Sequence, residues 1–175
     1  MNINEKTKLN MVIGNPISHT KSPILHDLIY KELGINAVML PFSNNSKNNL
    51  KKLISVIKIL AINLVAVTIP FKEKIMSHLD KIDLSAKAIG AVNTIVNRDG
   101  KLWGYNTDTL GIEYAFRNII LYNKNVLLIG AGGAGLAVAY VVTKQGGKCS
   151  YVDPTLSKMQ LLQKKFGGKV IPIEN

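Results

Sequence analysis

Four short stretches of this sequence carry the side chains that could do chemistry. They are GNPISHTKSP (14–23), VTIPFKEK (67–74), GAVNT (90–94) and GYNTD (104–108). Each lies at a predicted strand end or turn and places small hydroxyl or amide groups there, and the set also contains Lys72 and Asp108. Hydroxyls and amides can hydrogen-bond both ring oxygens and a carboxylate, so this set of groups suits a small polyhydroxy acid.

The groups divide by the part of such a ligand that they could bind. Thr20 and Ser22 could hold a carboxylate, and Thr68, Asn93 and Asp108 could hold ring hydroxyls. Each also has an ordinary explanation as a turn residue or a helix cap, and taken singly these explanations are the better ones. Four such stretches ahead of a nucleotide motif favour a binding site.

Lys72 is the candidate for acid–base chemistry. It lies on the turn after Pro70-Phe71, where a lysine could transfer a proton to a bound ligand. The alternative is that Lys72 is one of the many surface lysines of this chain.

The segment VLLIGAGGAG (126–135) matches a dinucleotide-binding fingerprint between a predicted strand and a predicted helix. One glycine permits the tight turn, the next lets the backbone approach a pyrophosphate, and the third lets the helix pack on the strand. The helix start offers free N–H groups to the phosphates. The alternative is a glycine-rich buried turn. The predicted cofactor-binding residues of this segment are Gly130, Ala131, Gly132, Gly133, Ala134 and Gly135.

Asp153 ends the next predicted strand, where an acidic residue accepts the ribose hydroxyls of a dinucleotide. A carboxylate there repels the 2′-phosphate of NADP, and no arginine is near. Lys158 is the nearest cation and could take the place of an arginine. We therefore expect NAD(P)H as the cofactor, with NAD favoured over NADP.

Strands and helices alternate along most of the chain, which predicts an α/β fold with a mostly parallel sheet in both parts. Asp99-Gly100, between two β-rich runs, predicts a hairpin. A polar turn at 121–124 predicts a boundary, with a substrate-binding domain over 1–121 and part of a Rossmann dinucleotide-binding domain over 122–175.

Strands are predicted at 10–14, 37–42, 64–69, 125–129, 148–152 and near 170. Helices are predicted over 22–33, 84–89, 109–121, 133–145 and 156–166, with a short one after Phe71 and an amphipathic one that places Leu50, Leu53, Ile54, Ile57 and Leu60 on one face.

Composition and charge narrow the class of protein. A length of 175 residues with 47% apolar content allows one domain plus part of another. The net charge of +11 is compatible with a nucleic-acid partner. However, the lysines are scattered along the sequence, and no basic helix or zinc-ligand set accompanies them. The uncharged run 126–143 could suggest a membrane helix, but its glycines favour strand, turn and helix. We expect no nucleic-acid, membrane or metal partner.

A cytoplasmic location is expected, and the cysteine content is neutral evidence on the compartment. Cys149 is the single cysteine, so an internal disulfide framework is excluded. The polar N-terminus is followed by an apolar run that is too short for a signal peptide.

In this order the segments closely resemble the shikimate dehydrogenase family, which includes the quinate/shikimate dehydrogenases. The motifs PFK, GAVNT, NTD and GAGGA carry the resemblance, which extends from Val12 to Phe166. The family reduces 3-dehydroshikimate to shikimate with a nicotinamide cofactor, in the chorismate pathway to aromatic amino acids. The resemblance implies that Lys72 is the catalytic lysine and Asp108 its partner. It also implies substrate contacts through Thr20, Ser22, Thr68, Asn93 and Asp108.

The sequence departs from the family pattern at three places. Thr20-Lys21-Ser22 stands where the family has Ser-x-Ser, so the first position keeps its hydroxyl and gains a methyl group. This change bears on whether quinate or shikimate is the preferred substrate. Ala66 stands where the family has an asparagine, so an amide near the substrate is lost. Asp153-Pro154-Thr155 replaces the family's Asn-Arg-Thr stretch, which contacts the NADP phosphate, and this agrees with the expected preference for NAD.

Length is the largest departure from the family. A doubly wound domain uses two halves, and only the first is present, ending near Val170. The later elements, which include a C-terminal helix with a substrate-binding glutamine, are absent. We expect an active shikimate dehydrogenase. One alternative is an NAD-preferring quinate/shikimate dehydrogenase. The other is a truncated relative, weakly active or inactive, that binds a small hydroxy acid or nucleotide. An exposed sheet edge at the last strand could permit self-association.

Overall fold

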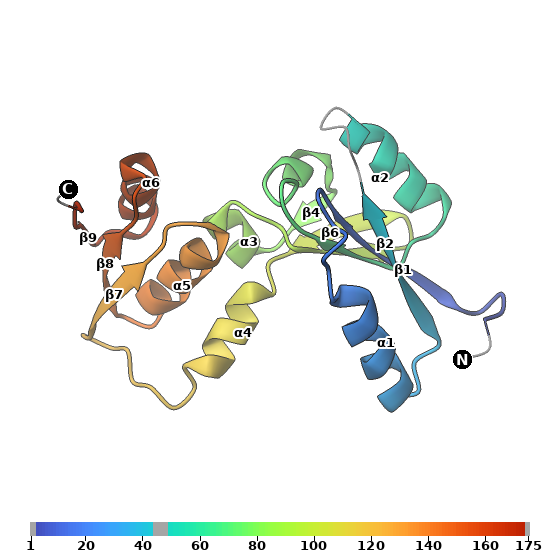
Figure 1. Cartoon of the computed structure of the whole chain (residues 1–175), viewed down its shortest axis with the longest axis horizontal. Coiled ribbons are helices and arrows are strands. Elements are labelled where there is room, and N and C mark those ends of the chain that lie inside the picture. Colours follow the sequence, from blue (N-terminus) through green and yellow to red (C-terminus); the bar gives the residue numbers. More distant parts are fainter. Residues whose placement is uncertain (1–2, 44–48, 174–175) are drawn as a thin grey trace. The chain divides into compact units, whose positions relative to one another are not determined.

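The structure, a computed structural model, describes residues 3–43 and 49–173 and divides into two compact units (Figure 1). The first unit comprises Met1–Ala86 and Gly90–Asn106, and the second comprises Lys87–Ile89 and Thr107–Asn175. Each unit contains a sheet and helices, which confirms the predicted α/β class. The assignment of 1–121 to substrate binding and of 122–175 to a partial Rossmann domain stays a prediction.

A six-stranded mixed sheet forms the centre of the first unit. Its strands are β1 (Lys8–Gly14), β2 (Ala37–Ser43), β3 (Leu64–Val67), β4 (Lys81–Ile82), β5 (Thr94–Arg98) and β6 (Lys101–Tyr105), in the order β2-β1-β3-β5-β6-β4. Strand β1 pairs in parallel with β2 and β3, whereas β5 is antiparallel to β3 and β6. The short strand β4 is not predicted from the sequence. The helices are α1 (Ser22–Glu32), α2 (Leu50–Ile59), the 3-10 helix η2 (Lys74–His78) and α3 (Leu84–Ile89), whose last residues belong to the second unit.

The two faces of this sheet carry separate apolar clusters, because successive strand residues point to opposite sides. Met11 and Ile13 of β1 belong to the larger cluster, which includes the buried side chains of α2. Val12 points to the opposite face and packs in a smaller cluster with Tyr30 of α1. The sheet is therefore held between α2 on one face and α1 on the other.

Helix α2 confirms the predicted apolar face with one exception. Its buried side chains are Leu50, Leu53, Ile54 and Ile57. Leu60 is predicted to share that face but is 52% exposed, because α2 ends at Ile59 and Leu60 lies at its C-cap.

The hairpin between β5 and β6 turns at Asp99-Gly100, as predicted. Asp99 has φ +53° and Gly100 has φ +81°, the pair of positive φ angles that a two-residue type I′ turn requires. The Gly100 N–H donates to Asn97 Oδ1 at 2.9 Å. This turn pairs Thr94 with Tyr105, so the start of β5 lies beside the end of β6.

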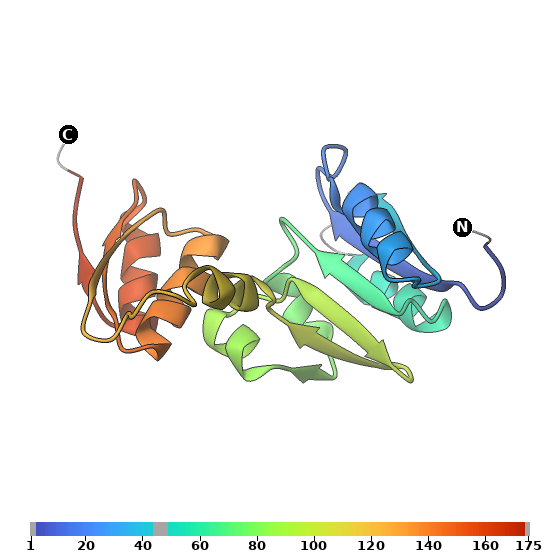
Figure 2. The ribbon, with the colours of Figure 1, turned by 90° about the horizontal axis from the view of Figure 1, so that it is seen from below.

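A parallel three-stranded sheet, in the order β7-β8-β9, forms the centre of the second unit (Figure 2). The elements are α4 (Asp108–Ala115), β7 (Asn125–Ile129), α5 (Gly133–Lys144), β8 (Lys148–Val152), α6 (Leu156–Phe166) and β9 (Lys169–Val170). Leu128, Cys149 and Tyr151 are buried on one face of the sheet, whereas Leu127 and Ile129 on the other face of β7 are 58% and 79% exposed. The expected self-association stays a prediction.

Helix α4 is shorter than predicted, since it ends at Ala115 and not at Leu121. Arg117 Nη1 donates to the Tyr114 carbonyl at 2.8 Å, and the Arg117 guanidinium lies 3.9 Å from the centre of the Tyr114 ring. The same carbonyl also accepts from the Arg117 backbone N–H at 3.3 Å, so Arg117 donates to the helix end twice. The β-branched pair Ile119-Ile120 that follows has low helix propensity.

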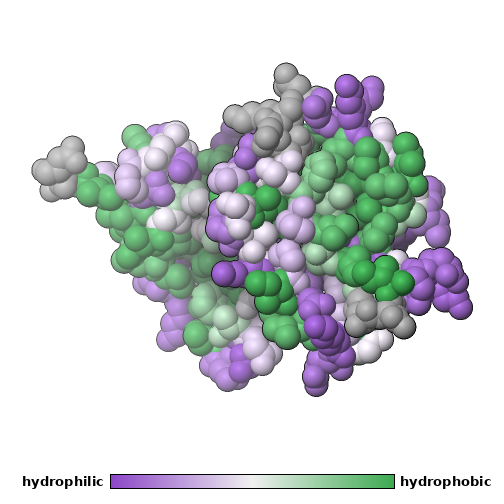
Figure 3. Space-filling model, turned by 45° about the vertical axis from the view of Figure 1, so that its right-hand side comes forward, coloured by the Kyte–Doolittle hydropathy of each residue, from purple (hydrophilic) through white to green (hydrophobic). Residues whose placement is uncertain are grey.

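Apolar side chains gather on parts of the surface of the first unit (Figure 3). Helix α1 exposes Ile24, Leu25 and Leu28, and the edge strand β2 exposes Leu40 and Phe42. Within residues 3–43 and 49–173, no helix combines the length and the apolar character needed to cross a membrane.

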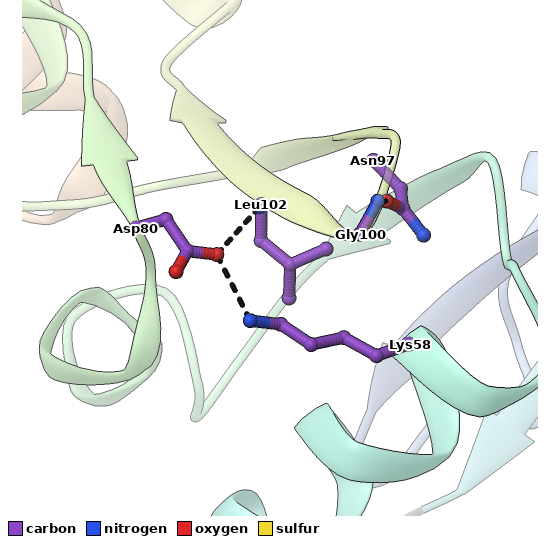
Figure 4. A network of polar contacts seen from close by, with 5 residues as sticks. All are labelled: Lys58, Asp80, Asn97, Gly100 and Leu102. Carbon is purple, nitrogen blue, oxygen red and sulfur yellow. Dashed lines mark hydrogen bonds and ion pairs between the residues drawn. The ribbon is translucent and has the colours of Figure 1, made fainter.

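Asp80 joins three segments of the first unit through one carboxylate oxygen (Figure 4). Its Oδ2 accepts from the Leu102 N–H of β6 at 2.7 Å and from Lys58 Nζ of α2 at 3.0 Å. The Leu102 bond first, and the Lys58 bond second, hold the pKa of Asp80 below its usual range. A lowered pKa means that the carboxylate stabilises the fold above its unfolded pKa, and that this contribution is lost as the pH falls through the folded value.

We expect Asp80→Ala to lower the free energy of unfolding by about 1 kcal/mol, because the buried end of the Leu102 bond loses a charged acceptor while the exposed ion pair adds little. Thermal unfolding measures the loss at neutral pH, and the gap to wild type should close as the pH falls below about 4. Asp27→Ala is the control, because the Asp27–Lys31 ion pair lies on the exposed surface of α1. Equal losses in both variants would contradict a role for the Leu102 bond.

Candidate functional site

The four polar stretches meet at one edge of the first sheet. Strands β1, β3 and β6 run in one direction and β5 runs against them, so three carboxyl ends and the amino end of β5 share that edge. The segment after β1 carries Thr20 and Ser22, the segment after β3 carries Thr68 and Lys72, and Asn93 directly precedes β5. Strand direction therefore brings five of the predicted site residues to one edge.

Gly14 permits close contact between the segments that follow β1 and β3. The Asn15 N–H donates to the Ile69 carbonyl at 2.9 Å. A side chain at Gly14 would collide with Thr68 Cγ2 and press on the Ile69 carbonyl oxygen, so only glycine fits. The contact holds Thr68 beside the segment that carries Thr20.

The hydroxyls of Thr20 and Ser22 lie side by side. Thr20 Oγ1 donates to Ser22 Oγ at 3.2 Å, and the Ser22 N–H donates to Thr20 Oγ1 at 3.3 Å. The alternative role of Ser22 as a helix cap does not hold, because Lys21 is the N-cap and Ser22 is the first helical residue, followed by Pro23. Thr20 also lines a cavity of about 460 Å³ between this segment and Ser43 of β2.

A backbone network joins Lys72 to Asn93. The Val92 N–H donates to the Lys72 carbonyl at 2.8 Å. The Asn93 N–H donates to the Tyr105 carbonyl at 3.0 Å, and the Asn93 carbonyl accepts from the Val67 N–H at 2.7 Å. Residues 91–93 therefore connect the segment after β3 to the end of β6.

Asp108 is the first residue of α4 and belongs to the second unit, whereas Lys72 belongs to the first. Their predicted proximity stays a prediction. Among residues 3–43 and 49–173, no group of three or more His, Cys, Asp or Glu side chains is arranged to hold a metal ion.

The predicted glycine fingerprint forms the turn between β7 and α5. Gly130 has φ +100°, and a side chain at Gly135 would collide with the Gly130 carbonyl, so both positions require glycine. Gly132 is the N-cap of α5, and a Cβ there would meet no other described part of the chain within 4 Å. Its missing side chain therefore leaves open space at the helix N-terminus, where N–H groups can bind an anion.

Asp153, after β8, is tied to this glycine turn. Its Oδ2 accepts from the Ala131 N–H at 2.7 Å, and its Oδ1 accepts from the Thr155 N–H at 2.8 Å. These bonds, that of Ala131 first, lower the pKa of Asp153, so the carboxylate is ionised at neutral pH. Each oxygen keeps a lone pair and can accept a further hydrogen bond.

Asn106 is not among the site residues predicted from the sequence, although it lies within GYNTD. It is 3% exposed, and its Nδ2 donates to the Ala91 carbonyl at 3.0 Å. The only signal in the sequence is an amide directly after a predicted strand, which equally describes a turn residue.

Comparisons with known proteins agree with this architecture. The family described as the shikimate dehydrogenase substrate binding domain matches residues 12–95. The shikimate dehydrogenase (NADP(+)) of Methanococcus maripaludis strain C6 is 44% identical over 170 residues, which cover 96% of this chain and 60% of that protein. The crystal structure of Aquifex aeolicus shikimate dehydrogenase has a TM-score of 0.90 and 40% identity, covering 97% of this chain and 64% of that one. The crystal structure of Listeria monocytogenes shikimate 5-dehydrogenase, in complex with shikimate and NAD, has a TM-score of 0.85 and 30% identity. The match covers 99% of this chain and 63% of that one.

The chain belongs to the shikimate dehydrogenase family, which confirms the resemblance seen in its motifs. It spans about 60% of the length of the curated relatives that it matches. Those relatives are named as NADP(+) enzymes, so the comparisons do not support the predicted preference for NAD.

We expect Gly135→Ala to destabilise the chain by about 2–3 kcal/mol, because the new methyl group meets a backbone oxygen that cannot rotate away. Gly132→Ala is the control and should cost less than about 1 kcal/mol, since its methyl group points into open space. Thermal unfolding followed by circular dichroism compares the two variants. Equal stabilities would contradict the close packing of this turn.

Proposed function

We propose that this chain provides the substrate site and the adenosine side of the cofactor site of a shikimate dehydrogenase, which interconverts 3-dehydroshikimate and shikimate. The convergence of the four polar stretches at one sheet edge carries the proposal. Family membership supports the substrate class, since the Listeria relative is described in complex with shikimate. In this proposal residues 1–121 serve the substrate, and residues 122–175 serve the cofactor.

The substrate is held by hydroxyl and amide groups. Thr20 and Ser22 donate to the carboxylate, because two hydroxyls 3.2 Å apart can reach the two oxygens of one carboxylate. Thr68 and Asn93 bind the ring hydroxyls, and Asp108, from the second unit, accepts from one of them. Quinate is the alternative ligand, since it also carries a carboxylate and ring hydroxyls.

Lys72 is the proton donor in this mechanism. When hydride reaches the ketone carbon, the ketone oxygen must gain a proton. The Lys72 ammonium gives that proton and takes it back in the reverse reaction, with the Asp108 carboxylate as its partner.

A bound nicotinamide supplies the hydride, and the residues of the second unit suit the rest of that cofactor. The first-turn N–H groups of α5, those of Gly133, Ala134 and Gly135, suit the pyrophosphate. Gly130, Ala131 and Gly132 form the turn that leads into this helix. Asp153 suits the ribose hydroxyls, because its ionised carboxylate is held at the turn. The same charge repels a 2′-phosphate, so we propose a preference for NAD over NADP.

Lys72→Ala tests the substrate site. We expect wild type to bind shikimate in a calorimetric titration, and we expect turnover, followed as shikimate-dependent reduction of NAD, to fall roughly 10²–10⁴-fold in the variant. The loss of affinity should be smaller, because proton transfer is needed only in the reaction. Lys74→Ala, an exposed lysine of η2, is the control and should leave both quantities unchanged.

Three outcomes separate the candidate functions. Wild type that does not bind shikimate contradicts the proposal. Binding without turnover favours a relative that holds a hydroxy acid without converting it. Turnover that survives Lys72→Ala removes this lysine from the chemistry.

Separate titrations with NAD and NADP test the cofactor preference. We expect NAD to bind more tightly, and we expect Asp153→Asn to narrow the difference because the amide carries no charge. Lys158→Ala is the matched variant, since Lys158 is the cation near Asp153. Tighter NADP binding by wild type, abolished by Lys158→Ala, would show that the lysine outweighs the carboxylate.

A further inference from the structure

Asn106 lies where the ladder between β5 and β6 ends. The Asn93 N–H donates to the Tyr105 carbonyl at 3.0 Å, next to the last strand pair. Beyond that bond, the contact between the two segments is made by a side chain, since Asn106 Nδ2 donates to the Ala91 carbonyl at 3.0 Å. Asn106 is 3% exposed and Ala91 is 4% exposed, so this bond is made away from water.

The segment that Asn106 holds is the one that connects the substrate-site residues. Val92, the next residue, donates to the Lys72 carbonyl at 2.8 Å, and Asn93 is bonded on both sides, to Tyr105 and to Val67. A shift of the Ala91 carbonyl would therefore move the backbone of Asn93 and the anchor of Lys72 together.

We propose that Asn106 is a positioning residue of the substrate site. Through Ala91 it fixes the path of residues 91–93, and so sets where the Asn93 amide and the Lys72 side chain leave the sheet edge. The inference rests on the proposed function, because the residues that Asn106 positions are the proposed shikimate contacts. A buried amide suits this role, because its removal takes a hydrogen bond from a carbonyl that lies away from bulk water.

Asn106→Ala is the test, and Asn10→Ala is the matched control. Asn10 is also a buried asparagine of the first unit, 4% exposed, with its Nδ2 donating to Tyr30 Oη at 2.7 Å. We expect both variants to lose thermal stability. Only Asn106→Ala should weaken shikimate binding, by about ten-fold, the change that corresponds to one lost buried hydrogen bond. Asn10→Ala should stay within about two-fold of wild type.

Amide hydrogen exchange gives a second measurement that needs no ligand. The Val92 and Asn93 amides should exchange about ten-fold faster in Asn106→Ala than in Asn10→Ala, because local opening of residues 91–93 becomes easier. Asn106→Ser makes a smaller void and is measured in the same way if the alanine variant does not fold.

The outcomes separate this inference from the proposed function. Wild type that does not bind shikimate defeats the proposed function and, with it, a role of Asn106 in substrate binding. Wild type that binds, with equal affinity losses in the Asn106 and Asn10 variants, defeats the positioning role alone. Unchanged exchange at Val92 and Asn93 in Asn106→Ala also overturns it.

Discussion

The hydrogen bond from the Val92 N–H to the Lys72 carbonyl is the contact on which the arrangement of the proposed substrate site depends. It joins two segments that lie about twenty residues apart in the sequence. The bond is possible because β5 runs antiparallel to β3, which brings residues 91–93 to the edge where β3 ends. A parallel β5 would deliver its carboxyl end there and leave Asn93 at the opposite edge.

The proposed cofactor site of the second unit depends on the absence of side chains at its glycines. Gly130 and Gly135 are required by the geometry of the turn, whereas Gly132 leaves space that nothing else in the described chain occupies. Asp153 holds the turn through the Ala131 N–H and keeps its charge at neutral pH. A rigid turn, an open helix N-terminus and a fixed carboxylate together suit a dinucleotide.

Much of the fold can be predicted from the sequence, because apolar runs bounded by turn residues define most strands and helices, and Asp99-Gly100 defines its hairpin. Strand β4 is missed because its two residues are held by pairing with β6, which no local pattern reveals. The burial of Asn106 and the bond from Ala131 to Asp153 are missed for a similar reason, since each depends on how two strands are paired. The motifs indicate which groups are present, and only the sheet topology shows which of them meet.

Amide chemical shifts recorded during a titration with shikimate test most directly the convergence of the stretches 14–23, 67–74 and 90–94. The structure predicts that the largest shift changes occur together, with one dissociation constant, at Thr20, Thr68, Lys72 and Asn93, while the strands β7, β8 and β9 change little. Shikimate that leaves these four amides unchanged, or that perturbs only the turn from Gly130 to Gly135, would contradict a substrate site at this edge of the sheet.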